Sequence, residues 1–189
     1  MRETDDCNIT LESLSKQTMS DFEVIQVKDE GNGANWARNK GFKKAKTPYV
    51  LFSDNDINWE PTAIRDLYNA LNGSRCAYSY GWYSFSNVDV TMKYCNHSFS
   101  KEKLEAGNYI STMSMVVRDS FLGFDEKINR FQDWDAWLTL LKAEKIGVYC
   151  GKKIFTTEWV DHNYTAESSK RDEKIVKDKY ESINCSPSR

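Results

Sequence analysis

The strongest constraint on the fold is an alternation of helix-like and strand-like segments along the first 75 residues. Apolar side chains recur at helical spacing over residues 7–17, and residues 22–27 form a Val-rich run typical of a buried strand. A second helix is expected over 34–46, a strand over 49–52 and a third helix over 62–71. This order predicts an α/β fold with a mostly parallel central sheet flanked by helices.

The rest of the chain has a different pattern. We expect strands over 78–85, 112–118, 146–150 and 155–159, a helix with the apolar stripe Trp134, Trp137, Leu138 and Leu141, and an irregular polar stretch over 86–108. The charged residues 166–189 are expected to form a surface helix or a frayed tail. A chain of 189 residues fits one domain with a substantial core.

Composition narrows the class of partner. The net charge of −2 gives no sign of a nucleic-acid partner, and no apolar run reaches the roughly 20 residues of a membrane span. The five cysteines are an odd number without a zinc-binding spacing, and no targeting segment precedes them. We therefore expect reduced thiols and a cytoplasmic location.

Two carboxylates follow the apolar run 49–52. Asp54 and Asp56 flank Asn55, and residues i and i+2 of an extended segment point the same way. Such carboxylates repel each other unless a cation or protons compensate, and oxygen ligands suit a hard ion. The pair therefore predicts a Mn²⁺ or Mg²⁺ site where open α/β sheets bind their ligands. The alternative is an Asx-rich turn without a ligand.

Asp29 and Arg38 are further candidates on the same side of the predicted sheet. Asp29 ends the expected strand 22–27, so a parallel arrangement would bring it into one cleft with Asp54, where it could accept hydrogen bonds from a base or a ribose. Its alternative role is simply to begin a turn. Arg38 offers a bidentate fork for a diphosphate, as could Lys40, although the lysines of this helix are better explained as a solvated face.

Asp133 and Asp135 stand at the start of the Trp-rich helix. An aspartate is expected to cap this helix, which leaves the other free to face the cleft. A carboxylate beside tryptophans in a partly closed site can have a raised pKa, which suits a general base.

Several of these segments occur in an order that resembles a known family. They read Leu11-Glu-Ser-Leu-Ser-Lys-Gln-Thr18, Asp21-Phe-Glu-Val-Ile-Gln-Val-Lys-Asp29, Ala37-Arg-Asn-Lys-Gly41, Tyr49-Val-Leu-Phe-Ser-Asp-Asn-Asp56, Val117-Arg118, Gly123-Phe-Asp125 and Gln132-Asp-Trp-Asp-Ala-Trp-Leu138. Together, over roughly residues 8–160, they resemble family 2 glycosyltransferases of the GT-A fold.

The resemblance implies a metal-dependent, inverting transfer of sugar from a nucleotide-diphosphate donor, usually a UDP-sugar, to a hydroxyl of a glycan, lipid-linked or protein acceptor. It divides a single GT-A domain, 1–189, into a nucleotide-binding half, 1–75, an acceptor-side half, 76–165, and the charged tail, 166–189. The roles it implies are base contact for Asp29, nucleotide or phosphate contact for Arg38, ribose or metal contact for Asp54, metal ligation for Asp56, deprotonation of the acceptor for Asp133, and a metal or phosphate contact for His162.

Two departures from the family pattern leave alternatives open. The usual first strand is missing, since residues 1–6 have no apolar side chain after Met1, and Gln132 stands where Glu is usual. These departures favour a non-catalytic module that binds sugar nucleotides or glycans. A nucleotidyltransferase, which also combines an α/β sheet with carboxylate-bound Mg²⁺, is a third possibility, although it would need no acceptor base at 132–135.

Overall fold

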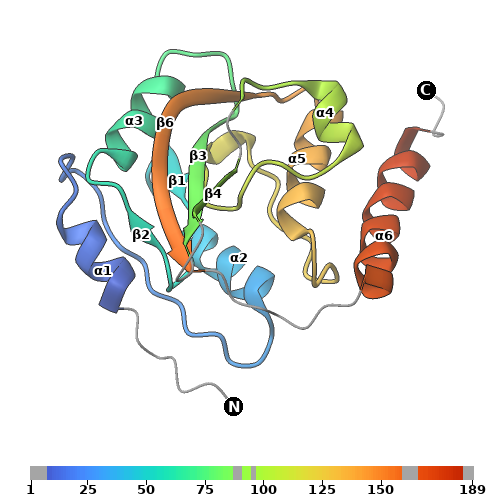
Figure 1. Cartoon of the computed structure of the whole chain (residues 1–189), viewed down its shortest axis with the longest axis horizontal. Coiled ribbons are helices and arrows are strands. Elements are labelled where there is room, and N and C mark those ends of the chain that lie inside the picture. Colours follow the sequence, from blue (N-terminus) through green and yellow to red (C-terminus); the bar gives the residue numbers. More distant parts are fainter. Residues whose placement is uncertain (1–7, 87–90, 95–96, 159–165, 185–189) are drawn as a thin grey trace.

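The structure is a computed structural model that describes residues 8–86, 91–94, 97–158 and 166–184. Its helices and strands, in chain order, are α1 (Asn8–Ser15), α2 (Ala34–Lys44), β1 (Tyr49–Leu51), β2 (Asn58–Trp59), α3 (Ala63–Leu71), β3 (Tyr78–Ser86), β4 (Thr91–Tyr94), α4 (Lys101–Ala106), β5 (Met115–Val117), the 3₁₀-helix η1 (Arg118–Ser120), α5 (Gln132–Lys142), β6 (Gly147–Glu158) and α6 (Ala166–Asn184). The α/β architecture expected from the sequence is confirmed, with helices on both sides of one sheet (Figure 1).

The sheet is mixed rather than mostly parallel. Its strand order is β1-β5-β3-β6-β2, with β4 added on β3. Within the described residues only β3 and β6 run parallel, and the other four strand pairs are antiparallel. The expectation of a mostly parallel sheet was wrong because it paired consecutive strands, whereas β1 pairs with β5, more than sixty residues further along the chain.

The segment 22–27 is not a strand. It is coil, and its side chains are half-buried or exposed, with Val24 48% exposed. Val27 lies against α2, because a Cβ added at Gly41 would be 3.4 Å from its Cγ2. Strand propensity reports how well side chains fit a pleated surface, and it does not supply the neighbouring strand on which a ladder depends.

Two other expectations were wrong in their details. The two short strands expected over 146–150 and 155–159 form one strand, β6, in which Gly151 adopts a left-handed φ of 74°. Pairing with β3 shifts register near Trp82, as in a β-bulge, so the strand continues past the polar residues 151–153. The stretch 86–108, expected to be irregular, contains β4 and α4.

Two groups of buried side chains cover opposite faces of the sheet. One lies with α3, whose buried residues Ala63, Ile64, Leu67 and Leu71 form one stripe, and Leu14 of α1 packs against it. The other lies with α5, where the Trp137 ring stacks on Tyr78 at a centroid distance of 4.5 Å. Val176 of α6 joins this second group, so residues 166–184 of the charged tail form a helix that packs on the domain (Figure 1).

None of the helices in the described parts of the chain combines the length and the apolar character needed to cross a bilayer.

Candidate functional site

Helix α1 holds the turn that carries Asp54 and Asp56. The buried Thr10 hydroxyl donates to the Asp54 carbonyl at 3.1 Å and to the Ile57 carbonyl at 3.0 Å, and it accepts from the Ile57 N–H at 2.9 Å. Asp54 is half-buried and Asp56 is exposed. The backbone of the turn is therefore fixed while its carboxylates remain near the surface.

Arg38 and Asp54 form the central ion pair of the site. Their side chains come from α2 and from the end of β1, and Arg38 Nη2 lies 2.7 Å from Asp54 Oδ1. The Arg38 side chain is only 11% exposed, whereas that of Asp54 is 39% exposed. Arg38 Nη1 also donates to the Asn35 side-chain oxygen at 3.3 Å, one turn back on α2, which orients the guanidinium.

Asp133 lies in the first turn of α5, close to the same guanidinium. Asn108 donates to its Oδ1 at 2.9 Å, and the Trp134 N–H donates to the same oxygen at 2.9 Å. Desolvation by the surrounding side chains raises the pKa of Asp133, and the positive charge of Arg38 opposes that rise in part. Arg38 thus pairs directly with Asp54 and its charge also reaches Asp133, while the roles of all three residues stay predictions.

The start of α5 has an unusual N-cap. It is Phe131, a non-glycine residue with a left-handed φ of 57° whose own side chain makes no capping hydrogen bond, and Asp133 accepts from the Trp134 N–H within the first turn. Asp135 is buried, with 4% exposure, and it pairs with Lys179 of α6 rather than capping the helix. Desolvation raises the pKa of Asp135 as well. A left-handed phenylalanine is costly, and such conformations concentrate at functional sites.

Asp29 is engaged in its own turn. Its Oδ1 accepts from the N–H groups of Gly31, Asn32 and Gly33, each at 3.0 Å, immediately before α2 begins. Asp29 does not lie at the end of a strand parallel to that of Asp54, because 22–27 is not a strand. The turn role left open by the sequence is thus present, and contact with a base stays a prediction.

The lysines of α2 and the metal candidates are placed as follows. Lys40 pairs with Glu30 at 3.3 Å and lies over the Trp36 ring, and Lys43 and Lys44 are exposed.

His162, the further candidate for a metal ligand, lies outside the described residues. Within the parts of the chain that are described, no three His, Cys, Asp or Glu side chains gather closely enough to hold a metal ion.

Four supporting residues were not predicted from the sequence. Asn35 and Asn39 of α2 hydrogen-bond to the segment 123–128, and Asn108 contacts Asp133. Asparagine is a poor residue for a helix interior, so two of them in one helix were a usable signal of specific partners. Lys179 stands among many charged residues of α6, and the sequence offers no signal that distinguishes it.

Comparison with known proteins assigns the family. The family profile described as "Glycosyl transferase family 2" matches residues 4–131, which is more than half of the chain. The chain belongs to glycosyl transferase family 2. This membership confirms the resemblance seen in the sequence.

Two curated proteins resemble parts of this family 2 chain. The "Putative teichuronic acid biosynthesis glycosyltransferase TuaG" of Bacillus subtilis (strain 168) is 26% identical over 147 residues, which are 73% of the chain and 58% of TuaG. A protein described as tryptophan–tRNA ligase, from Rickettsia felis, is 28% identical over 114 residues, which are 59% of the chain and 30% of that protein. The chain thus spans a little over half of the first relative and a third or less of the second.

The solved structures with a similar fold include S. aureus TarS. TarS 1–349 in complex with UDP-GlcNAc superposes with a TM-score of 0.65 at 14% identity, covering 89% of the chain and 61% of TarS 1–349. The complex with UDP gives a TM-score of 0.63, again at 14% identity, over 89% of the chain and 60% of TarS 1–349. This likeness identifies the fold of the family 2 chain as GT-A.

Proposed function

We propose that the chain is the catalytic domain of a glycosyltransferase that moves a sugar from a UDP-sugar onto a hydroxyl group, with inversion at the anomeric carbon. One observation carries the proposal: Arg38 is paired with the strand-end carboxylate of Asp54 and also acts on the half-buried carboxylate of Asp133. The charge of a candidate donor-binding cation thus reaches the candidate base for the acceptor. The UDP and UDP-GlcNAc bound to TarS support a donor of this class.

Asp133 acts as the general base. Its carboxylate accepts the proton of the acceptor hydroxyl while that oxygen bonds to the anomeric carbon. The bond from that carbon to the diphosphate breaks, and the electron pair leaves with UDP. Because desolvation raises the pKa of Asp133, its carboxylate is a better proton acceptor than an exposed aspartate.

Arg38 offsets the charge that develops on the leaving diphosphate. A guanidinium has five N–H donors, and among the described residues Asp54 and Asn35 engage two of its nitrogens. The remaining donors can bind phosphate oxygens. Its low exposure strengthens this interaction, because charges interact more strongly where water is excluded.

The turn after β1 fits a divalent cation shared with the donor. Asp54 and Asp56 supply two carboxylates, and Mg²⁺ or Mn²⁺ sites often use one or two carboxylates and fill the other positions with water and substrate phosphates. His162 is a further candidate ligand. A bound cation would supply charge neutralisation at the departing diphosphate.

A binding module without turnover is the second candidate. Gln132, in the first turn of α5, favours it because a glutamine cannot add a second carboxylate beside Asp133. The family assignment leaves no specific observation in favour of a nucleotidyltransferase.

The test begins with thermal unfolding in the presence of UDP, with and without Mn²⁺. We expect stabilisation only with both, of about 2.7 kcal/mol when the ligand is at one hundred times its dissociation constant. Asp56→Ala should abolish the metal-dependent part, and Arg38→Met should weaken UDP binding. The matched controls are Asp119→Ala, whose carboxylate is 93% exposed, and the exposed Arg65→Met.

The outcomes separate the candidates. Release of UDP from a UDP-sugar by the parent, lost in Asp133→Asn while UDP still binds, supports the enzyme. Binding without UDP release from any UDP-sugar would favour the module. Equal stabilisation by UDP in EDTA would exclude the metal bridge.

A further inference from the structure

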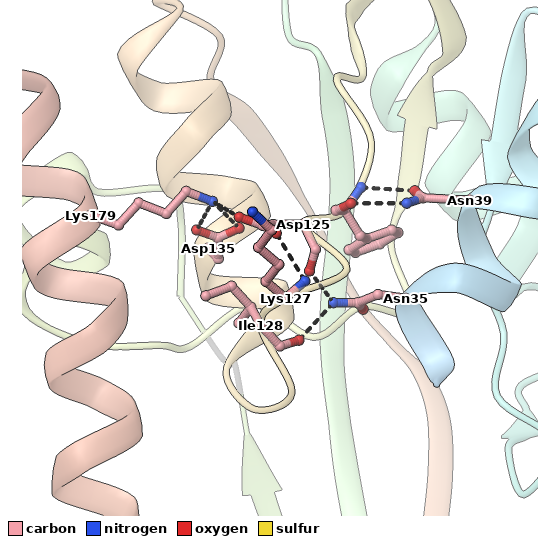
Figure 2. Close-up of polar contacts among 8 residues, drawn as sticks. Asn35, Asn39, Asp125, Lys127, Ile128, Asp135 and Lys179 are labelled. Atoms are coloured by element: carbon pink, nitrogen blue, oxygen red, sulfur yellow. Dashed lines mark hydrogen bonds and ion pairs between the residues drawn. The ribbon is translucent and has the colours of Figure 1, made fainter. Parts of the chain in front are cut away.

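Lys179 joins three elements through one ammonium group. Its Nζ lies 2.8 Å from Asp125 Oδ2, in the segment after η1, and 2.7 Å from Asp135 Oδ1 of α5 (Figure 2). The Asp135 side chain is only 6% exposed, and those of Lys179 and Asp125 are each 32% exposed. A bridge this far out of water has a defined geometry, unlike a pair on an open surface.

The same segment is tied to α2 from the other side. Asn35 Nδ2 donates to the carbonyls of Asp125 at 2.8 Å and Ile128 at 2.9 Å. Asn39 donates to the Phe124 carbonyl and accepts from the Phe124 N–H, both at 2.9 Å (Figure 2). Asp125 therefore contacts α6 through its carboxylate, and its backbone carbonyl accepts from Asn35 of α2.

Both sides of the proposed site connect to this network. Asn35 orients Arg38 through the bond to Nη1 at 3.3 Å. Asp135 lies two residues after Asp133 in the same turn of α5. Lys179 thus links the helix that carries the base with the segment that holds the donor-binding helix.

Helix α6 has other attachments that do not depend on Lys179. Val176 is 1% exposed, and the Tyr180 hydroxyl donates to Glu105 Oε1 of α4 at 2.8 Å. Lys142 of α5 donates to the Tyr180 carbonyl. Burial and the Glu105 carboxylate raise the pKa of Tyr180 to about 12, as expected for a hydroxyl that donates to a carboxylate. Loss of the Lys179 charge therefore leaves α6 docked.

We propose that Lys179 is a positioning residue, which fixes the distance between Asp133 and Arg38 by bridging Asp125 and Asp135. The assignment of these two ends rests on the proposed glycosyltransferase function. Lys179 touches neither donor nor acceptor in this proposal. Its effect is on turnover, because a small displacement between base and donor is costly in the transition state while each still binds its own ligand.

The first experiment compares Lys179→Met, Lys179→Arg and Lys174→Met. Lys174 is the matched control, since it lies on the same helix, is 72% exposed and, among the described residues, pairs with Asp178 one turn away. We expect Lys179→Met to lower kcat about tenfold with little change in UDP affinity, Lys179→Arg to recover most of that loss, and Lys174→Met to match the parent. Unchanged kcat in Lys179→Met would overturn the proposal.

A second variant covers the possibility that Lys179→Met does not fold. The single variant Lys179→Met leaves the buried Asp135 carboxylate without its cation, which is strongly destabilising. The double variant Lys179→Met/Asp135→Asn removes both charges. We expect the double variant to fold and to show the same tenfold loss of kcat. Full turnover in this variant would show that the bridge has no positioning role.

A readout independent of turnover separates this proposal from the proposed function. Amide hydrogen exchange should accelerate over residues 121–135 and 34–39 in Lys179→Met, but not in Lys174→Met. If the parent has no transferase activity but Lys179→Met shows this exchange pattern, the proposed function is contradicted and the positioning network is supported. Faster exchange confined to α6, in an active parent, would retain the function and reject the positioning role.

Discussion

Asp133 carries a carboxylate whose own surroundings make it costly to ionise. Its pKa is raised because desolvation outweighs the hydrogen bonds from Asn108 and the Trp134 N–H and the charge of Arg38. A group in this state gains from receiving a proton. The same property that suits it to catalysis therefore reduces the stability of the folded protein.

The pH dependence of turnover follows from this shift. The base must be ionised, so kcat should fall as the pH drops through the pKa of Asp133, and the midpoint should lie above the ordinary 3.8 of an aspartate. A pH–rate profile of the parent with saturating donor checks this. Asp133→Asn should lose about 10²-fold or more in kcat and lose this acid limb, and an unchanged limb would assign it to another group.

Unlike its kcat, the stability of Asp133→Asn at neutral pH should not decrease. Because the folded-state pKa is raised, the ionised carboxylate destabilises the native state once the pH exceeds both pKa values, and this cost is absent below the ordinary 3.8. Asparagine keeps an oxygen for the Asn108 and Trp134 donors. Its melting temperature at pH 7 should therefore equal or exceed that of the parent, and a clear decrease would contradict the direction of the shift.

Candidate residues could be chosen from the sequence by charge and position. Asp54 follows a strand and Asp133 begins an apolar helix, and the roles proposed for these two residues and for Arg38 stay predictions. The partners of Asn35, Asn108 and Lys179 could not be derived, since they are backbone carbonyls or carboxylates of distant segments. Such partners are fixed by tertiary packing, which the local sequence does not contain.

At the scale of elements, α1 acts through its hydroxyl groups. Thr10 makes three hydrogen bonds to the turn that carries Asp54 and Asp56, and Ser13 adds a fourth, to the Ile57 carbonyl at 3.3 Å. Both side chains are buried. A short helix thereby replaces the strand ladder that would otherwise hold this turn.

Thr10→Val tests the role of α1. Valine matches threonine in shape, but it leaves the buried Ile57 N–H without its acceptor, so we expect a loss of about 1–3 kcal/mol in the free energy of unfolding. Metal-dependent UDP binding should weaken as well, because the carboxylate turn loses its anchor. The exposed Thr18→Val is the control, and equal behaviour of both variants in denaturant titrations would reject the anchor.

Helices were predicted better than strands for a physical reason. The pattern of α3 and α5 is local, so their apolar stripes appear directly in the sequence. A strand needs a partner, and within the described residues β1 pairs with the distant β5. The segment 22–27 has the composition of a strand but pairs with no strand in that part of the chain. The mixed sheet could not be derived without knowing these distant pairings.

At the scale of the whole molecule, the parallel pair β3 and β6 supports both proposed halves. The strand β6 pairs with β3 over most of its length and also with β2, which follows the carboxylate turn. The core groups on the two faces of the sheet share Tyr83 of β3 as a packing residue. Neither half can lose its structure without removing packing from the other.

Thermal unfolding should therefore be a single transition. For 189 residues the calorimetric enthalpy near 60 °C should be about 130 kcal/mol, and it should equal the van't Hoff enthalpy. Scanning calorimetry with and without UDP and Mn²⁺ checks this, and the ligands should shift the whole transition upward. Two resolved transitions, of which only one responds to the ligands, would show that the halves unfold separately.

The close contact between β3 and β6 also limits how this domain can exchange parts with its relatives. A Cβ at Gly147 would lie 2.3 Å from the Tyr78 ring, and one at Gly81 would lie 2.6 Å from the Lys152 carbonyl and from Ile154. Each glycine is thus matched to a residue of the opposite strand. In a library of recombined family members, the variants that fold should be those in which both strands come from the same parent. The two strands are therefore inherited as one block.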